Sequence, residues 1–377
     1  MDFELSAEQV AMRDVARNML GERWHPDKMR EAIDKPPATI PTDLWAELSQ
    51  MGWLGVNCDE ILGGGGQDIL TAAILVEEAG RALLPSTFST NLASAWAIEN
   101  SANQAHRDGL LTELVLGNKR VTLAIEENHG SWGPDTIELN ATGNDRDDTL
   151  HLSGTKLLVP DGSTADLFLV AARHDENLCL VAVDADAQGV TVNAMKRLDG
   201  ADIVELELND VAVPASALLQ WGGDGESLLR EVYSVFTVLI AADLLGSAEV
   251  TLQMTSDYAK ERVQFGQPIG SFQAVSHRLA DILVQVEIGR SLLYGACLAL
   301  TEQREERHAL VAAAKSWLNE TAIDATEAGV QLHGGIGNSW ELDVHLHLRR
   351  ARSNAATLGD SDFHRDQIAN YYCDRPG

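Results

Sequence analysis

The sequence predicts an α+β protein with three successive regions: helices, then short strands, then a helical bundle. Apolar residues recur at helical spacing early in the chain, for example Leu44, Leu48 and Met51. Near Lys119 the period changes to the alternation of short strands, and from about Glu226 it is helical again. We expect an N-terminal helical domain over residues 1–118, a middle antiparallel β barrel or sandwich over 119–222, and a C-terminal helical bundle over 223–377.

The N-terminal region carries clear helix signals. Residues 6–9, Ser-Ala-Glu-Gln, form a capping-box pattern, so the first helix is expected to begin at about residue 7. Another helix is expected through Ile74, Leu75 and Ala79, after a loop of four glycines at 63–66. No strand feeds these glycines and no Lys-Ser/Thr pair follows them, which favours a plain turn over a phosphate-binding loop.

Short β-like runs define the middle region. Turns rich in Asp, Asn and Gly separate them, which is typical of an antiparallel sheet. The expected strands are residues 121–126, 136–140, 149–152, 167–171, 178–183 and 203–208, and the run 209–214 is expected to end the region. Further on, apolar residues recur at three- and four-residue steps from Phe272 to Val286, which is the stripe of a bundle helix.

Composition limits the partners and the location. The 377 residues include 28 Lys and Arg against 57 Asp and Glu, a formal net charge of −29, which argues against a nucleic-acid or anionic-membrane partner. The four cysteines show neither a CxxC pair nor a disulfide framework. The start resembles no signal peptide, and no run of about 18 apolar residues occurs, so we expect a soluble, cytoplasmic protein.

One segment between two long helical patterns concentrates polar and aromatic groups on a turn rich in Gly and Pro. Arg262 can present a guanidinium fork to a phosphate or carboxylate, Gln264 an amide to a polar ligand edge, and Phe265 a ring to a heterocycle. The simpler alternative is a connection between helices, with Arg262 as a solvated surface charge.

The spacing of this segment resembles the acyl-CoA dehydrogenase family. The resemblance rests on Arg-x-x-Phe-Gly at 262–266 with Phe-Gln at 272–273, on Gln-Leu-His-Gly-Gly-Ile-Gly at 331–337, and on the N-terminal runs 51–55 and 77–81. It covers nearly the whole chain, to about Arg365. It implies an FAD-dependent oxidoreductase of lipid metabolism with a C-terminal four-helix bundle, which desaturates an acyl-CoA thioester and passes electrons to an electron-transfer flavoprotein or similar acceptor.

In this family FAD lies across a dimer interface, and the residues that serve the neighbouring subunit's FAD are present here. The resemblance assigns Arg262 to the pyrophosphate, Phe265 to the flavin or adenine surface, and Gln264 and Gln273 to polar contacts. Gln331, Gly334 and Gly335 complete the set, since glycines let backbone N–H groups approach a phosphate. Taken alone, this second motif is equally typical of a helix C-cap followed by a loop.

The residues that would serve the chain's own flavin are altered. Where the family has Thr-Glu-Pro-x-x-Gly-Ser-Asp, residues 125–132 read Ile-Glu-Glu-Asn-His-Gly-Ser-Trp, and the flavin-contacting threonine is lost. Where the family has Lys-x-Trp/Tyr-Ile-Thr/Ser-Asn-Gly, residues 156–162 place Pro160 at the hydroxyl position. The position of the usual catalytic glutamate holds Leu358, and the alternate position of the base holds Phe236, so no catalytic residue is expected at either.

Other titratable residues are expected to be structural. Glu126, Glu127 and Asp360 are each expected to be solvated acids. His345 and His347 alternate as on one face of a strand or irregular turn, and without a third nearby ligand they predict no metal site. Asp243 interrupts an apolar helix and is expected to be a buried polar contact, with no specific role assigned.

The one-sided alteration leads to three hypotheses. The chain is a non-catalytic subunit that contributes half of an FAD site to a homologous partner carrying the catalytic Glu; this resembles heterotetrameric actinobacterial enzymes that shorten steroid side chains, and implies a steroid acyl-CoA substrate. Alternatively, it is a self-sufficient homo-oligomeric acyl-CoA dehydrogenase with a displaced base such as Asp360 or Glu127. The third hypothesis is a flavin-free scaffold or acyl-CoA-binding protein.

Overall fold

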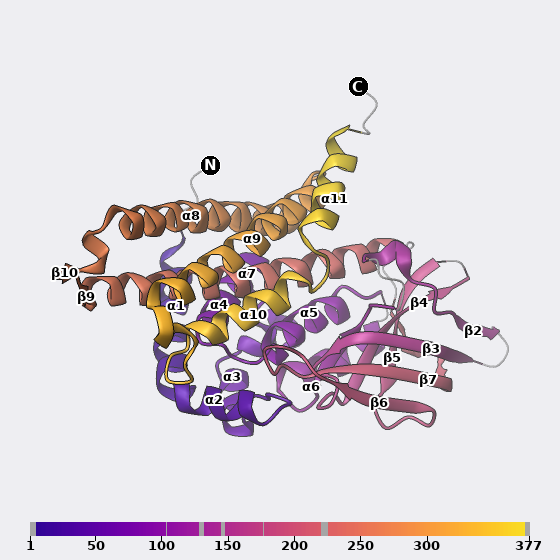
Figure 1. The fold of residues 1–377 in the computed structure, drawn as a ribbon. Helices are drawn as coiled ribbons and strands as arrows, with labels where there is room; N and C mark the ends of the chain where they lie inside the picture. Colours follow the sequence, from indigo (N-terminus) through magenta and orange to yellow (C-terminus); the bar gives the residue numbers. More distant parts are fainter. Residues whose placement is uncertain are drawn as a thin grey trace. The chain divides into compact units, whose positions relative to one another are not determined.

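The computed structural model describes residues 5–102, 104–127, 132–144, 148–175, 177–219 and 225–373. Figure 1 shows the helices and strands with the labels used below. They form two compact units. The first unit comprises Met1–Arg30, Ala73–Leu84 and Thr237–Gly377, and the second comprises Glu31–Ala72 and Pro85–Phe236.

Helices dominate the first unit. Helix α9 packs against α8, α10 and α11, and Figure 1 shows α8 and α9 running side by side. The unit contains α1 (Ala7–Arg23), the start of α2 (Pro26–Asp34), the later parts of α4 (Ile69–Arg81) and α7 (Gly225–Glu261), the short strands β9 (Val263–Gln264) and β10 (Gln267–Pro268), the 3-10 turns η5 (Ile269–Ser271) and η6 (Gly334–Asn338), and α8 (Gln273–Thr301), α9 (Arg307–His333), α10 (Val344–Ala355) and α11 (Ser361–Cys373).

The predicted N-terminal signals are confirmed. The hydroxyl of Ser6 accepts from the Gln9 backbone N–H at 3.1 Å and the Gln9 side chain accepts from the Ser6 N–H at 3.0 Å, so α1 begins at Ala7. The four-glycine loop is a packed turn, because a Cβ on Gly64 would stand 2.2 Å from the Cys58 carbonyl oxygen.

Two helices, α7 and α8, are long and apolar enough to cross a membrane by length and composition. The most apolar window of α7 is 83% buried inside the protein, as in the core helix of a soluble protein, whereas that of α8 is 44% buried. One or two such helices are weak grounds for a membrane protein. Helix α8 instead keeps an exposed apolar face that includes Leu283, Val284 and Ile288.

The second unit contains two four-stranded sheets with the strand orders β1-β4-β5-β8 and β2-β3-β7-β6. Every pairing among them is antiparallel except that of β1 with β4, which is parallel. The strands are β1 (Val121–Ala124), β2 (Ala141–Asn144), β3 (Thr149–Pro160), β4 (Leu167–His174), β5 (Asn177–Asp184), β6 (Val190–Met195), β7 (Ile203–Pro214) and β8 (Leu218–Leu219). Helices α3 (Thr42–Gln50), α5 (Thr87–Glu99) and α6 (Gln104–Val115) complete the unit with the 3-10 turns η1 (Trp53–Gly55), η2 (Glu60–Leu62), η3 (Pro134–Thr136) and η4 (Ala215–Ala217).

Three strand predictions were wrong. Residues 134–136 form a 3-10 turn, and β2 begins only at Ala141. Strand β6 was missed because most of its residues are exposed, which leaves no alternating apolar pattern. Strand β7 continues through the predicted end of the region to Pro214; where Asp210 adopts a left-handed backbone (φ 50°), the pairing with β3 shifts register between Leu152 and Gly154 and then resumes at Val211.

Candidate functional site

A β-hairpin presents the residues predicted to contact a neighbouring subunit's cofactor. The sequence predicted a turn between two helices; strands β9 and β10 pair there, and the two-residue loop Phe265–Gly266 joins them. Both loop residues have positive φ, 51° for Phe265 and 82° for Gly266, as a tight hairpin requires. A bulky side chain is strained in this conformation. The Phe265 side chain is nevertheless 93% exposed at the tip, with one edge-to-face contact to Phe272.

The hydrogen-bond donors of this hairpin are directed to solvent. The side chains of Arg262 and Gln273 are exposed, and neither has a hydrogen bond or ion pair within the described part of the chain. Gln264 is also exposed, and its amide reaches only the neighbouring Val263 carbonyl, at 2.8 Å. The hairpin itself is held by its backbone, since Arg262 bonds Tyr258 and Ile269 at 2.8 Å each. The exposed side chains are therefore available for an external ligand.

A ring stack joins the base of this hairpin to the second predicted motif. Tyr258 stacks on His333 with ring centroids 4.4 Å apart, and His333 lies between Gln331 and Gly334 at the end of α9. The Gln331 side chain is exposed and has no bonding partner among the residues that the structure describes. Residues 262–273 and 331–335 are called the hairpin segments below.

The two glycines of this motif leave the backbone accessible. A Cβ at Gly334 or Gly335 would meet nothing within 4 Å, and Gly334 adopts φ 65° and ψ −140°, which suits glycine. The Gly334 N–H already donates to the Gln331 carbonyl as a helix cap. The chemistry of the donor set is a guanidinium, several amides and an open glycine backbone. It fits the pyrophosphate and heterocycle of a dinucleotide.

The altered strand segments contain a buried ion pair. The Lys156 side chain is fully buried on β3, and its ammonium group lies 2.5 Å from a Glu127 carboxylate oxygen and 3.2 Å from the Ile125 carbonyl. Glu127 also accepts from the backbone N–H groups of Glu138 and Leu139. Glu127 was predicted to be solvated, and that is wrong: its side chain is 6% exposed and serves as the counter-ion of Lys156.

Glu126, also predicted to be solvated, is largely buried. One of its carboxylate oxygens is inaccessible and has no hydrogen-bond partner in the described ranges. Burial raises the pKa of Glu126 to about 7, partly offset by Lys156. Of the altered run 125–132, residues 128–131 lie outside the described residues.

The end of the second altered run is fixed by hydroxyl groups. Asp161 is buried with φ 56°, and its carboxylate accepts hydrogen bonds from Ser86, Thr87 and Thr90 near the start of α5. Burial raises the pKa of Asp161 to about 6. At the position where the family places an aromatic residue, Leu158 is half exposed on a β-bulge. The hydrogen-bonding capacity of the Asp161 carboxylate is therefore met by side chains of the same chain.

The loop that would carry the catalytic glutamate is closed by a buried lysine. The Leu358 side chain is 4% exposed, with the backbone in the left-handed region (φ 57°). Lys315 donates to Asn319 at 2.7 Å and to the carbonyls of Asn354 and Gly359 at 3.0 and 3.3 Å. His364 donates to the Leu358 carbonyl at 3.0 Å, and burial lowers the pKa of His364 to about 3. Residues 125–127, 156–161 and 358–364 are called the altered segments.

Asp360 and the alternate base position provide no poised base. Asp360, predicted to be a solvated acid, is half-buried, and its carboxylate accepts from the Phe363 N–H at 2.9 Å as the cap of α11. Phe236 is buried in α7 and is 2% exposed. Neither position holds a free carboxylate.

One further expectation is corrected and one is confirmed. His345 and His347 were predicted on a strand or irregular turn, but both are buried on helix α10. Asp243, which was expected to be a buried polar contact, accepts two hydrogen bonds from Arg350 at 3.1 and 2.8 Å and one from Asn354 at 2.7 Å. A lone acid in an apolar helix was the only sequence signal of this buried pair.

Comparison with known proteins agrees with this architecture. Models of the acyl-CoA dehydrogenase family match in three parts: the N-terminal domain at residues 6–118, the middle domain at 122–211 and the C-terminal domain at 223–372. Acyl-CoA dehydrogenase FadE27 of Mycobacterium tuberculosis is 31% identical over 385 residues, covering 100% of both chains.

Two solved structures are similar over nearly their full length. The ChsE4–ChsE5 complex from Mycobacterium tuberculosis has a TM-score of 0.92 at 28% identity, covering 100% of both chains. A variant of the Tcur3481–Tcur3483 steroid ACAD has a TM-score of 0.89 at 29% identity, covering 97% of this chain and 98% of that one. FAD is the cofactor of the family. The chain therefore belongs to the acyl-CoA dehydrogenase family, with that family's helical, β and helical domains.

Proposed function

We propose that this chain is the non-catalytic subunit of a hetero-oligomeric, FAD-dependent acyl-CoA dehydrogenase. It contributes the hairpin segments to the FAD site of a homologous partner chain, and the partner supplies the catalytic glutamate. The observation that carries the proposal is the strained, 93% exposed Phe265 beside the unpaired donors Arg262 and Gln273. A fold gains nothing from such an arrangement unless a ligand or partner covers it.

The altered segments support the same division of labour. Lys156 and Glu127 neutralise each other in the strand region, and Leu358 stands in place of the base. When bound, FAD accepts the hydride that leaves the β-carbon of the acyl-CoA. A carboxylate must remove the α-proton in the same reaction, and in this proposal that carboxylate belongs to the partner.

In the shared site, this chain's residues bind and orient. Arg262 pairs with the pyrophosphate, Phe265 covers the flavin or adenine surface, and Gln264, Gln273 and Gln331 donate amide hydrogens. Gly335 lets its backbone approach a phosphate closely. These assignments place the chain's contribution at binding, with no proton transfer by its own groups.

The names of similar proteins support our choice of partner and substrate. The similar structures include the ChsE4–ChsE5 complex and the Tcur3481–Tcur3483 steroid ACAD. By analogy we assign a heterotetramer, a bulky steroid acyl-CoA substrate, an electron-transfer flavoprotein or similar acceptor, and a cytoplasmic location. The predicted domain boundaries at residues 118/119 and 222/223 are retained as part of this proposal.

Flavin stoichiometry tests the proposal. The chain is expressed alone and with its adjacent homologous reading frame, and FAD per chain is counted beside the mass of each assembly. We expect about one FAD per two chains, found only in the mixed complex. A full complement of FAD and acyl-CoA oxidation by the chain alone would overturn the proposal, and a purified complex without flavin absorbance would favour a flavin-free role.

Glu126 supports a second candidate, a self-sufficient homo-oligomeric enzyme with a displaced base. Its buried carboxyl has a pKa near 7, which suits a general base, whereas Glu127 and Asp360 are already engaged. Under this alternative, Glu126→Gln abolishes turnover by the chain alone while FAD content stays unchanged. Under the subunit proposal, the mixed complex keeps its turnover with Glu126→Gln.

A further inference from the structure

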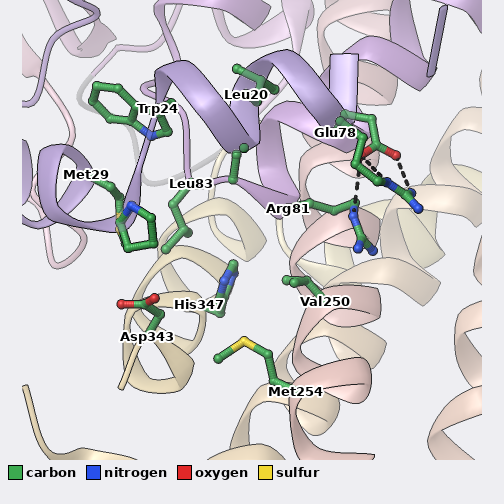
Figure 2. A pocket seen from close by; sticks show the side chains of 14 residues that line it. Leu20, Trp24, Met29, Glu78, Arg81, Leu83, Val250, Met254, Asp343 and His347 are labelled. Atoms are coloured by element: carbon green, nitrogen blue, oxygen red, sulfur yellow. Dashed lines mark hydrogen bonds and ion pairs between the residues drawn. The ribbon is translucent and has the colours of Figure 1, made fainter. Parts of the chain in front are cut away.

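A cavity of about 280 Å³ lies within the first unit, among α1, α2, α4, α7 and α10 (Figure 2). None of the residues in the hairpin segments or the altered segments lines it. It is therefore a separate feature of the fold, and its occupant does not depend on the flavin proposal.

The greater part of the wall is apolar. Figure 2 shows Leu83, Val250 and Met254 around the cavity, with Leu20 and Met29 toward α1 and α2. Unbranched methionine side chains adapt to ligands of irregular shape. Such a wall gains free energy when an apolar group replaces water against it.

Two buried polar side chains at the cavity have unmet hydrogen-bonding capacity. Trp24 and His347 are each 3% exposed, and the indole nitrogen of Trp24 and Nδ1 of His347 have no hydrogen-bond partner in the described structure. Figure 2 shows both rings among the lining side chains, from α1 and α10. The indole N–H can only donate, so a buried acceptor is missing there.

The charged side of the wall favours an anion. Arg17 bonds Glu78 through two nitrogens at 2.9 and 2.6 Å, and Arg81 pairs with the same carboxylate at 3.4 Å. Asp343, the other acid on the wall, is neutralised by Arg30 at 2.8 Å. Two guanidinium groups thus share Glu78, although Arg81 also reaches Glu249 at 3.1 Å. The wall therefore has no net charge, and an anion would be recognised by the wall's hydrogen-bond donors: Nη1 of Arg81 is buried and has no hydrogen-bond partner among the described residues.

Water alone matches this wall poorly. A water molecule takes roughly 30 Å³, so the cavity would hold several, and most of them would face apolar carbon. A molecule with an apolar body and one terminal anionic acceptor satisfies both kinds of surface. If each non-hydrogen atom of a ligand, with its hydrogens, takes the same roughly 30 Å³ as a water molecule, the cavity accommodates about nine non-hydrogen atoms.

We propose that this cavity binds a small amphiphilic monocarboxylate of about eight carbons, the carboxylate carbon included. The apolar chain lies against Leu83, Val250 and Met254. The carboxylate accepts hydrogen bonds from the indole N–H of Trp24 and from the guanidinium of Arg81. Binding is reversible and involves no chemical step.

Gly21 offers a way to block the cavity while keeping the fold. It lines the cavity from within α1, and a Cβ there would meet nothing within 4 Å. A leucine at this position gains helix propensity and adds a bulky side chain to the cavity wall. Gly109, within α6, is equally free of neighbours and provides the matched control, Gly109→Leu.

The test is titration calorimetry of sodium octanoate into the full chain. We expect saturable binding by the wild type and by Gly109→Leu, and at least tenfold weaker binding by Gly21→Leu. Trp24→Phe should weaken binding about threefold to tenfold, whereas Trp317→Phe, whose indole donates to Gln285 elsewhere on α8 and α9, should not.

Three outcomes would overturn the proposal: no binding by the wild type, equal binding by Gly21→Leu, or equal affinity for octanamide, which has the same chain without the charge. Circular dichroism melting curves verify that each variant is folded. The FAD content of the mixed complex should be the same in Gly21→Leu and wild type, which keeps this test distinct from that of the subunit role.

Discussion

The hairpin segments and the altered segments treat their polar groups in opposite ways. Arg262 and Gln273 project into solvent without partners, whereas Lys156 and Glu127 are buried against each other. Polar groups that a fold needs are satisfied within the chain, because an unmatched buried group costs about 1–3 kcal/mol. The proposed function assigns the unpaired, exposed polar groups of the hairpin to a ligand outside the chain.

This difference separates two kinds of energetic contribution. Substitutions in the altered segments should change the free energy of unfolding of the chain alone. Substitutions in the hairpin segments should leave that quantity unchanged and reduce FAD binding in the mixed complex. Each prediction below measures both quantities.

The largest expected effect is the loss of the buried ion pair. Lys156→Met leaves Glu127 charged and buried, so we expect the free energy of unfolding to fall by about 3–5 kcal/mol in urea denaturation. The double variant Lys156→Met/Glu127→Gln should recover part of this loss. Lys35→Met breaks an exposed ion pair and should leave the midpoint unchanged. A loss below about 1 kcal/mol would show that the pair is not essential to this region.

The second largest effect is expected for Arg262→Ala, which tests the role of the hairpin segments. Because a charge-assisted bond contributes about 1.5–3 kcal/mol, FAD affinity of the mixed complex should fall roughly 10- to 100-fold. The unfolding midpoint should not move, since the side chain is exposed and unpaired in the described structure. Arg13→Ala, at a half-buried arginine of α1 paired with Asp14, is the control. Unchanged flavin content in Arg262→Ala would contradict the assigned phosphate contact.

A smaller effect concerns pH and Glu126. Its pKa is raised to about 7 in the folded chain, so the folded state holds the proton more tightly than the unfolded state, whose pKa is near 4.5. The free energy of unfolding should therefore fall as the pH rises from about 4.5 to about 7. Glu126→Gln removes this contribution. The free energy of unfolding of Glu126→Gln minus that of the wild type should therefore be about 1–2 kcal/mol larger at pH 8 than at pH 5. A pH-independent difference between the two proteins would refute this explanation.

The smallest predicted effect is that of one neutral amide. Gln273→Ala should weaken FAD binding by the mixed complex about 2- to 10-fold, since a hydrogen bond contributes about 0.5–1.5 kcal/mol. Fluorescence titration of the apo-complex with FAD measures it. Gln253→Ala, on the exposed surface of α7, is the control. If Gln273→Ala reduced the FAD affinity more than Arg262→Ala does, the amide would be the principal contact.

Local signals predicted much of the fold. The capping box at Ser6 and the apolar stripe of α8 depend on residues close in sequence, and both helices lie where periodicity placed them. Strand β6 was missed because an exposed strand has no apolar alternation. The parallel pairing of β1 with β4 was also missed, because it joins residues more than 40 positions apart.

The sequence predicted which residue types form the candidate site, but it did not predict their burial or their backbone strain. Spacing singled out Arg262 and Leu358, but the φ of Phe265 and the burial of Glu126 depend on the folded backbone. The partner of Glu127 is Lys156, 29 positions away on strand β3. Solvation was the reasonable prediction for such an acid, and tertiary packing decided otherwise.

The exposed ring of Phe265 has a consequence for the cell that makes this chain. An uncovered aromatic on a prominent hairpin is an adhesive surface, which promotes aggregation and recognition by chaperones and proteases. Under the proposed subunit role, synthesis of this chain should therefore be matched to synthesis of its partner. A cell that produces an excess of it should degrade the surplus, so the scarcer partner would set the amount of working enzyme.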